Sequence, residues 1–86
     1  MENQENQMKV LKFGGTSVGS AKNIQKVIEI VKNESLSENV SVVVSAIGGI
    51  TDRLLAAADK AVQKNKKYKV DFESIRLKHI EVIDGL

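Results

Sequence analysis

Two short apolar runs predict the strands of this protein. Residues 8–13 (MKVLKF) and residues 40–46 (VSVVVSA) are each bounded by polar residues or glycine, and the second run is rich in valine. Such continuous runs are typical of buried parallel strands, so the second is expected to be a central strand covered on both faces. A helical stretch separates the two runs, which predicts a right-handed βαβ unit with parallel strands.

The helix between these strands has one apolar face. Its stripe follows the i, i+3, i+4, i+7 spacing of a helix and consists of Ile24, Val27, Ile28 and Val31. Ser20 is the candidate N-cap, and the polar stretch NESLSEN predicts that the helix ends near residues 33–37.

Two further helices follow the second strand. The first has a broad apolar face made of Ile50, Leu54, Leu55, Ala58, Ala61 and Val62. Residues 63–69 are expected to form a loop, and the next helix to start near Val70 or Asp71. The apolar stripe of that helix consists of Phe72, Ile75, His79, Val82 and Leu86, with Ile80 and Ile83 beside it. His79 is expected to be a buried or half-buried packing residue that donates to a backbone group, in preference to a catalytic base.

The expected fold class is therefore α/β, with a parallel βαβ core and the element order β-α-β-α-α. Residues 1–7 are polar and amide-rich, and we expect a disordered leader there, followed by one structured unit over residues 8–86. A two-stranded sheet leaves exposed edges. This favours either an incomplete domain or a protomer that pairs its sheet edge with another chain.

Composition narrows the function classes only a little. Hydrophobic residues make up 42% of the chain and charged residues 28%, as in ordinary soluble proteins. The net charge of +2 is too balanced to indicate a nucleic-acid or membrane surface, and the basic stretch 64–69 is interpreted as a solvated loop. The chain has no cysteine, which excludes disulfides, thiolate metal sites and cysteine nucleophiles. Without a signal-like or membrane-spanning segment, the expected location is the cytoplasm.

Each predicted strand leads into a glycine pair, Gly14-Gly15 after the first and Gly48-Gly49 after the second. Glycine lets a ligand approach the main chain, so N–H groups beside a helix N-terminus can point at an anion such as phosphate. Parallel strands bring both turns to the carboxyl edge of the sheet, where open α/β folds bind ligands. The alternative is two plain βα turns, but two glycine pairs together favour an anion site.

Polar side chains flank both turns. Lys12 places a positive charge at the end of the first strand, and hydroxyl groups lie beside the first turn at Thr16 and Ser17 and beside the second at Ser45 and Thr51. Neither a P-loop nor a dinucleotide-binding fingerprint is present, because the lysine precedes the glycines and G-x-G-x-x-G does not occur.

Residues 12–18 (KFGGTSV) and 42–54 (VVVSAIGGITDRL) together resemble the N-terminal part of aspartate kinases, which belong to the amino-acid kinase fold family. These enzymes transfer a phosphoryl group from ATP to the side-chain carboxylate of aspartate, in the biosynthesis of amino acids such as lysine and threonine. The resemblance runs from about Met8 to the end of the chain, and it implies the first, incomplete part of a kinase domain of roughly 250 to 300 residues. Some members of the family also carry a homoserine dehydrogenase domain.

The resemblance also implies roles for individual residues. Lys12 matches the catalytic lysine that contacts phosphate, and the ATP phosphates are bound by Lys12, Gly14, Gly15, Thr16 and Ser17. Substrate aspartate is bound by Ser45, Gly48, Gly49 and Thr51. ATP with Mg²⁺ is the implied cofactor of the full-length enzyme, whose adenine-binding and metal-binding residues lie beyond Leu86, so no metal site is expected here. The isolated chain is expected to be inactive.

Two alternatives stay open. The parent protein could be an amino-acid kinase that acts on glutamate, a carbamate or a nucleotide, although Thr51-Asp52 after the second glycine pair favours aspartate. The chain could also be a non-catalytic module that self-associates through its sheet edge. The expected partners are aspartate, ATP and further copies of the chain, with no nucleic acid and no membrane.

Overall fold

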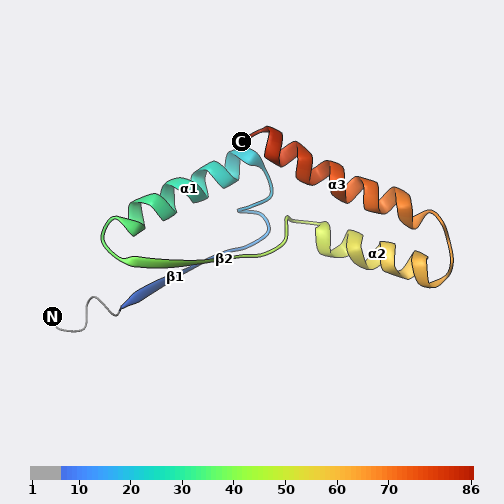
Figure 1. The fold of residues 1–86 in the computed structure, drawn as a ribbon, viewed down its shortest axis with the longest axis horizontal. Coiled ribbons are helices and arrows are strands. Elements are labelled where there is room, and N and C mark those ends of the chain that lie inside the picture. The colour runs from blue at the N-terminus through green and yellow to red at the C-terminus, as the bar shows by residue number, and fades with distance from the viewer. Residues whose placement is uncertain (1–6) are drawn as a thin grey trace.

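The structure is a computed structural model that describes residues 7–86. Its elements are β1 (Met8–Phe13), α1 (Ala21–Ser35), β2 (Asn39–Val44), α2 (Ile50–Val62) and α3 (Tyr68–Asp84). The strands pair in parallel, from Met8 beside Asn39 to Phe13 beside Val44. The predicted α/β class and the β-α-β-α-α order are therefore confirmed (Figure 1). Residues 1–6 of the expected leader lie outside the described residues.

Helix α1 packs along one face of the two-stranded sheet. Ser20 caps it as predicted, because its hydroxyl oxygen accepts a hydrogen bond from the Asn23 backbone N–H at 3.1 Å. Val27 is the buried residue of this helix. At its other end Lys9 Nζ of β1 lies 2.6 Å from Glu34 Oε2, which ties the start of the strand to the last turn of the helix.

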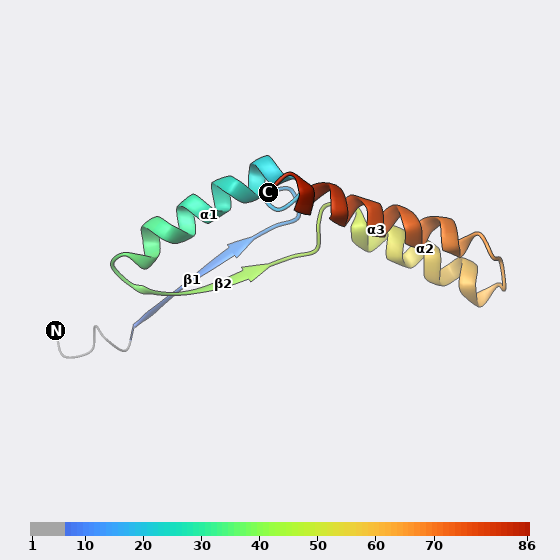
Figure 2. The same ribbon diagram turned by 45° about the horizontal axis from the view of Figure 1, so that its top comes forward.

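The other face of the sheet is open. Burial alternates along β1, with Lys9, Leu11 and Phe13 half-buried on the α1 side and the intervening side chains exposed. The expectation that the second strand is covered on both faces is wrong for residues 7–86, because the side chains of residues 42–44 are 42 to 55% exposed. Only α1 lies against the sheet, whereas α2 and α3 extend beyond its end (Figures 1 and 2).

Helices α2 and α3 form an antiparallel hairpin (Figure 2). Two polar contacts link its helices: Lys60 Nζ lies 2.7 Å from Asp71 Oδ2, and Arg53 Nη1 donates to Ser74 Oγ at 3.0 Å in an exposed position. Helix α3 starts at Tyr68, two to three residues before the expected start at Val70 or Asp71, so the loop is shorter than predicted.

The predicted apolar faces of the hairpin helices turn mostly outward. Ile50 of α2 and Val82 of α3 are buried, but Phe72 is 62% exposed, and most of the apolar face of α2 is also exposed. His79 donates from Nδ1 to the Ile75 carbonyl oxygen at 2.7 Å, so the predicted backbone contact is confirmed. The expected burial of His79 is wrong, because its side chain is exposed.

The core of this chain is small. Among residues 7–86 the buried apolar side chains are Val18, Val27, Ile50 and Val82, whereas seventeen large apolar side chains are exposed. The radius of gyration is 17.6 Å, against about 12 Å for a compact domain of this length. The molecule is accordingly elongated, 60 × 26 × 14 Å. Within the described part of the chain, no helix has the length and apolar character needed to cross a membrane.

Candidate phosphate and substrate site

The two glycine turns touch at the carboxyl edge of the sheet. The Gly48 N–H donates a hydrogen bond to the Gly15 carbonyl oxygen at 3.1 Å. A Cβ atom at Gly15 would lie 3.0 Å from the Ala46 carbonyl oxygen and 3.1 Å from the Gly48 Cα, so only glycine fits there without moving backbone. The prediction that both turns emerge at one edge is therefore confirmed, and their main chains are in direct contact.

The first turn folds back on its own carbonyl groups. Val18 N–H donates to the Gly14 carbonyl oxygen at 3.3 Å, and Gly19 N–H donates to the Thr16 carbonyl oxygen at 3.1 Å. The N–H groups of Gly15, Thr16 and Ser17 have no acceptor among residues 7–86. Consecutive backbone donors of this kind are suited to binding an anion.

The second turn leads directly into α2. Gly49 has a φ of 86°, in the left-handed region that favours glycine, and it occupies the N-cap position of the helix without a side-chain cap. The helix N-terminus therefore lies at the same edge as the first turn, with Thr51 exposed in its first helical turn. Ser45 is also exposed, and its hydroxyl donates to the Ala46 carbonyl oxygen at 2.9 Å. A helix N-terminus in this position favours a negatively charged group.

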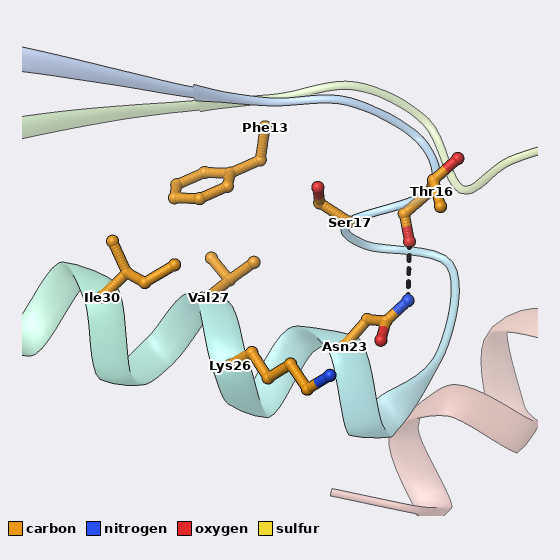
Figure 3. Close-up of a pocket in the computed structure, with 7 residues that line it drawn as sticks. All are labelled: Phe13, Thr16, Ser17, Asn23, Lys26, Val27 and Ile30. Atoms are coloured by element: carbon orange, nitrogen blue, oxygen red, sulfur yellow. Dashed lines mark hydrogen bonds between the residues drawn. The ribbon is translucent and has the colours of Figure 1, made fainter.

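Lys12 is exposed near the end of β1, where it is paired with Val43 of β2. No carboxylate within residues 7–86 forms an ion pair with it, so its charge is available to a ligand. Side chains alternate along a strand, which puts Lys12 on the sheet face opposite α1 and opposite Phe13. Lys12 therefore lies near the same edge of the sheet as the glycine turns, but on the open face. Ser17 lies on the other side, where it lines the cavity beside α1 (Figure 3).

A cavity of about 280 Å³ lies between the end of β1 and α1 (Figure 3). Its lining combines apolar and polar side chains: Phe13, Thr16, Ser17, Asn23, Lys26, Val27 and Ile30. Asn23 Nδ2 donates to the Thr16 carbonyl oxygen at 2.9 Å, which holds the first glycine turn against the helix. Sequence reasoning missed this role of Asn23. Its only signal there was an amide three residues after the capping serine.

The perturbed ionisable groups lie away from the glycine turns. The hydrogen bond to Glu34 raises the pKa of Lys9, and the hydrogen bond from Arg76 lowers the pKa of Glu73. Both pairs are structural contacts, one between β1 and α1 and the other along α3. Among the described residues no three histidine, cysteine or acidic side chains gather in a way that could hold a metal ion.

The fold and the contact between the turns define an open α/β unit with two loops placed for ligand binding at the carboxyl edge of its sheet. A model of the amino acid kinase family matches residues 7–84. The chain belongs to the amino acid kinase family.

Several similar proteins are aspartokinases, which agrees with the resemblance found in the two motifs. The chain is 35% identical over 75 residues to an aspartokinase of Rickettsia prowazekii, covering 86% of this chain and 17% of the relative. It is 52% identical over 54 residues to an aspartokinase of Chlamydia trachomatis, covering 63% of this chain and 12% of the relative.

A plant protein is also similar. The chain is 39% identical over 70 residues to the chloroplastic bifunctional aspartokinase/homoserine dehydrogenase 2 of Arabidopsis thaliana, covering 81% of this chain and 8% of the relative. The chain thus spans less than a fifth of the length of these relatives. No solved structure matches it significantly.

Proposed function

We propose that this chain supplies the ATP-phosphate and aspartate loops of an aspartokinase, which transfers the γ-phosphoryl group of ATP to the side-chain carboxylate of L-aspartate. The names of the relatives support the acceptor. The observation that carries the proposal is the contact between Gly15 and Gly48, because it holds two glycine turns from different strands at one edge. Donor and acceptor of a phosphoryl group have to meet at such a junction.

The proposed roles follow from the positions of the groups. The Lys12 ammonium group and the N–H groups of Gly15, Thr16 and Ser17 neutralise and orient the phosphates, beside Gly14. The second turn and the N-terminus of α2 hold aspartate through Ser45, Gly48, Gly49 and Thr51. A carboxylate oxygen of aspartate bonds to the γ-phosphorus as the bond from that phosphorus to the ADP oxygen breaks. Phosphoryl transfer depends mainly on positioning and charge neutralisation, which these groups are suited to provide.

Mg²⁺ accompanies ATP in the proposed reaction. The residues of the described chain do not form a ligand set for it, so we assign no metal-binding residue and derive no step through the metal. We further propose that the isolated chain is inactive because it holds one part of the site, that the parent enzyme acts in the cytoplasm, and that it is a homo-oligomer.

A chimera tests this proposal. We would replace the matching N-terminal segment of the Rickettsia prowazekii aspartokinase with residues 8–86 and trap aspartyl phosphate with hydroxylamine. The chimera should form product, and Lys12→Ala should lower its kcat about 10²- to 10³-fold, the usual cost of removing one group that stabilises transition-state charge. Lys32→Ala is the matched control, because Lys32 lies on α1 with its side chain 70% exposed, and activity should be unchanged.

Three results would contradict the proposal. The first is full activity of the Lys12→Ala chimera. The second is preference of the chimera for glutamate, carbamate or a nucleotide over aspartate. That result would keep the kinase class but rule out aspartate as the substrate. The third is turnover by the isolated 86-residue chain above that of its own Lys12→Ala variant, which would overturn the expectation that the chain alone is inactive.

A further inference from the structure

The N–H groups of Gly15, Thr16 and Ser17, which have no acceptor among residues 7–86, share one structural feature. Each belongs to a peptide unit whose carbonyl oxygen already accepts a hydrogen bond. In a planar trans peptide the C=O and N–H groups point in opposite directions, so a bond that fixes the carbonyl also fixes the N–H. The carbonyl bonds of this turn therefore decide where its free N–H groups point.

Backbone donors fix the first two of these peptide units. The Val18 N–H donates to the Gly14 carbonyl oxygen at 3.3 Å, and this bond fixes the direction of the Gly15 N–H. The Gly48 N–H donates to the Gly15 carbonyl oxygen at 3.1 Å, which fixes the Thr16 N–H in the same way. The directions of these two N–H groups therefore follow from the main chain of the two turns.

The third peptide unit is also fixed by a side chain. The Thr16 carbonyl oxygen accepts from the Gly19 N–H at 3.1 Å and from Asn23 Nδ2 at 2.9 Å, so both of its lone pairs are occupied. The bond from Asn23 holds this carbonyl toward α1 (Figure 3). The Ser17 N–H of the same peptide unit therefore points away from α1, toward the side of the sheet on which Lys12 lies.

The start of α1 holds Asn23 in place for this contact. Its backbone N–H donates to Ser20 Oγ at 3.1 Å, so the capping bond fixes the first helical turn. Helical side chains lean toward the N-terminus of their helix, which directs the Asn23 amide back to the loop before α1. One turn further along, Val27 is buried and anchors the helix. Asn23 thus links an anchored helix to the glycine turn.

We propose that Asn23 is a positioning residue for phosphate binding, which does not touch ATP but holds the Ser17 N–H in the direction from which it donates to a phosphate oxygen. This inference rests on the proposed function, because it takes the first glycine turn as the site of the ATP phosphates. A donor that is already oriented binds more tightly than one that the ligand has to order. Without the Asn23 side chain, the Thr16 carbonyl oxygen keeps only the bond from the Gly19 N–H, and its peptide unit gains freedom.

The KM of the chimera for ATP tests this role. Asn23→Ala should raise it about 3- to 10-fold, the range that corresponds to one hydrogen bond. The KM for aspartate should not change, because the second turn is the proposed site of that substrate. A merely structural role would reduce the amount of active enzyme, and therefore the apparent kcat, without changing either KM. Alanine is a strong helix former, so α1 should remain intact in this variant.

Asn33→Ala is the matched control. Asn33 is the same type of residue on the same helix, but it is exposed and lies about 15 Å along the helix from Asn23. Both KM values should equal those of the unmodified chimera. An equal rise in the KM for ATP in Asn33→Ala would overturn the inference, and so would an equal rise in both KM values in Asn23→Ala.

A measurement without ligand tests the same contact independently of turnover. Relaxation of ¹⁵N in the 86-residue chain gives an order parameter for each backbone N–H. In Asn23→Ala the order parameter at Ser17 should fall below the value of about 0.85 that is typical of rigid backbone. The value at Gly15 should not change, because the Val18 N–H still holds the Gly14 carbonyl oxygen. An unchanged value at Ser17, or an equal fall at both positions, would overturn the inference.

The outcomes separate this inference from the proposed function. A chimera that forms aspartyl phosphate and keeps its KM for ATP after Asn23→Ala overturns the positioning role and leaves the proposed function standing. A chimera that is inactive with Asn23 in place contradicts the proposed function. The order parameter at Ser17 then decides by itself whether Asn23 fixes this peptide unit.

Discussion

Replacing Gly15 with alanine should separate the two glycine turns. The added Cβ would lie 3.0 Å from the Ala46 carbonyl oxygen and 3.1 Å from both the backbone nitrogen and the Cα of Gly48. All three contacts are with backbone, so no side chain can rotate away to relieve them. The backbone of the two turns would have to move apart, and this movement would weaken or break the hydrogen bond from the Gly48 N–H to the Gly15 carbonyl oxygen.

The expected cost follows from these contacts. Overpacking costs about 1 to 3 kcal/mol, and losing a backbone hydrogen bond adds about 0.5 to 1.5 kcal/mol. We therefore expect Gly15→Ala to lower the free energy of unfolding by about 1.5 to 4.5 kcal/mol, a large part of the roughly 4 to 13 kcal/mol typical of a chain this long. With a urea m-value near 1 kcal/mol/M, the unfolding midpoint measured by circular dichroism should fall by about 1.5 M or more.

Gly14→Ala is the matched control for this experiment. No atom lies within 4 Å of a Cβ added at Gly14, and its φ is not positive. Alanine there should leave stability unchanged or raise it by about 0.4 to 1 kcal/mol, because it restricts the unfolded chain. Equal urea midpoints for the two variants would refute the argument that contact between the turns requires glycine at position 15.

Two further predictions concern the helices. In Gly85→Ala the new Cβ would lie 2.6 Å from the Ala21 Cβ, so the end of α3 should move away from the start of α1. The thermal unfolding midpoint should therefore fall, and an unchanged midpoint would contradict this contact. Because the hydrogen bond from Arg76 lowers the pKa of Glu73, this pair contributes stability above the ordinary carboxyl pKa of 4.5 and loses it as pH falls through the lower folded value. The urea midpoints of the wild type and Glu73→Gln should therefore converge on acidification below about pH 4.5, and a constant difference down to pH 3 would contradict the assignment.

The sequence by itself determined the elements and their order. Continuous apolar runs predicted both strands, and apolar periodicity predicted the three helices. Ser20 was identified as a cap because a hydroxyl before an apolar stripe satisfies an N-terminal backbone donor. The shared edge of the two glycine turns also followed from the sequence. A strand, helix and strand of these lengths connect in parallel, and parallel strands end at the same edge.

Tertiary structure alone decided which surfaces meet. The contact of Gly15 with Gly48 and the hydrogen bond from Asn23 to the first turn join residues that no periodic pattern relates. The exposure of His79 and of the valines in β2 was mispredicted for the same reason. Periodicity shows which side of a helix or strand is apolar. The element that covers that side depends on packing between distant segments, which here leaves one sheet face and most of the apolar side of α2 exposed.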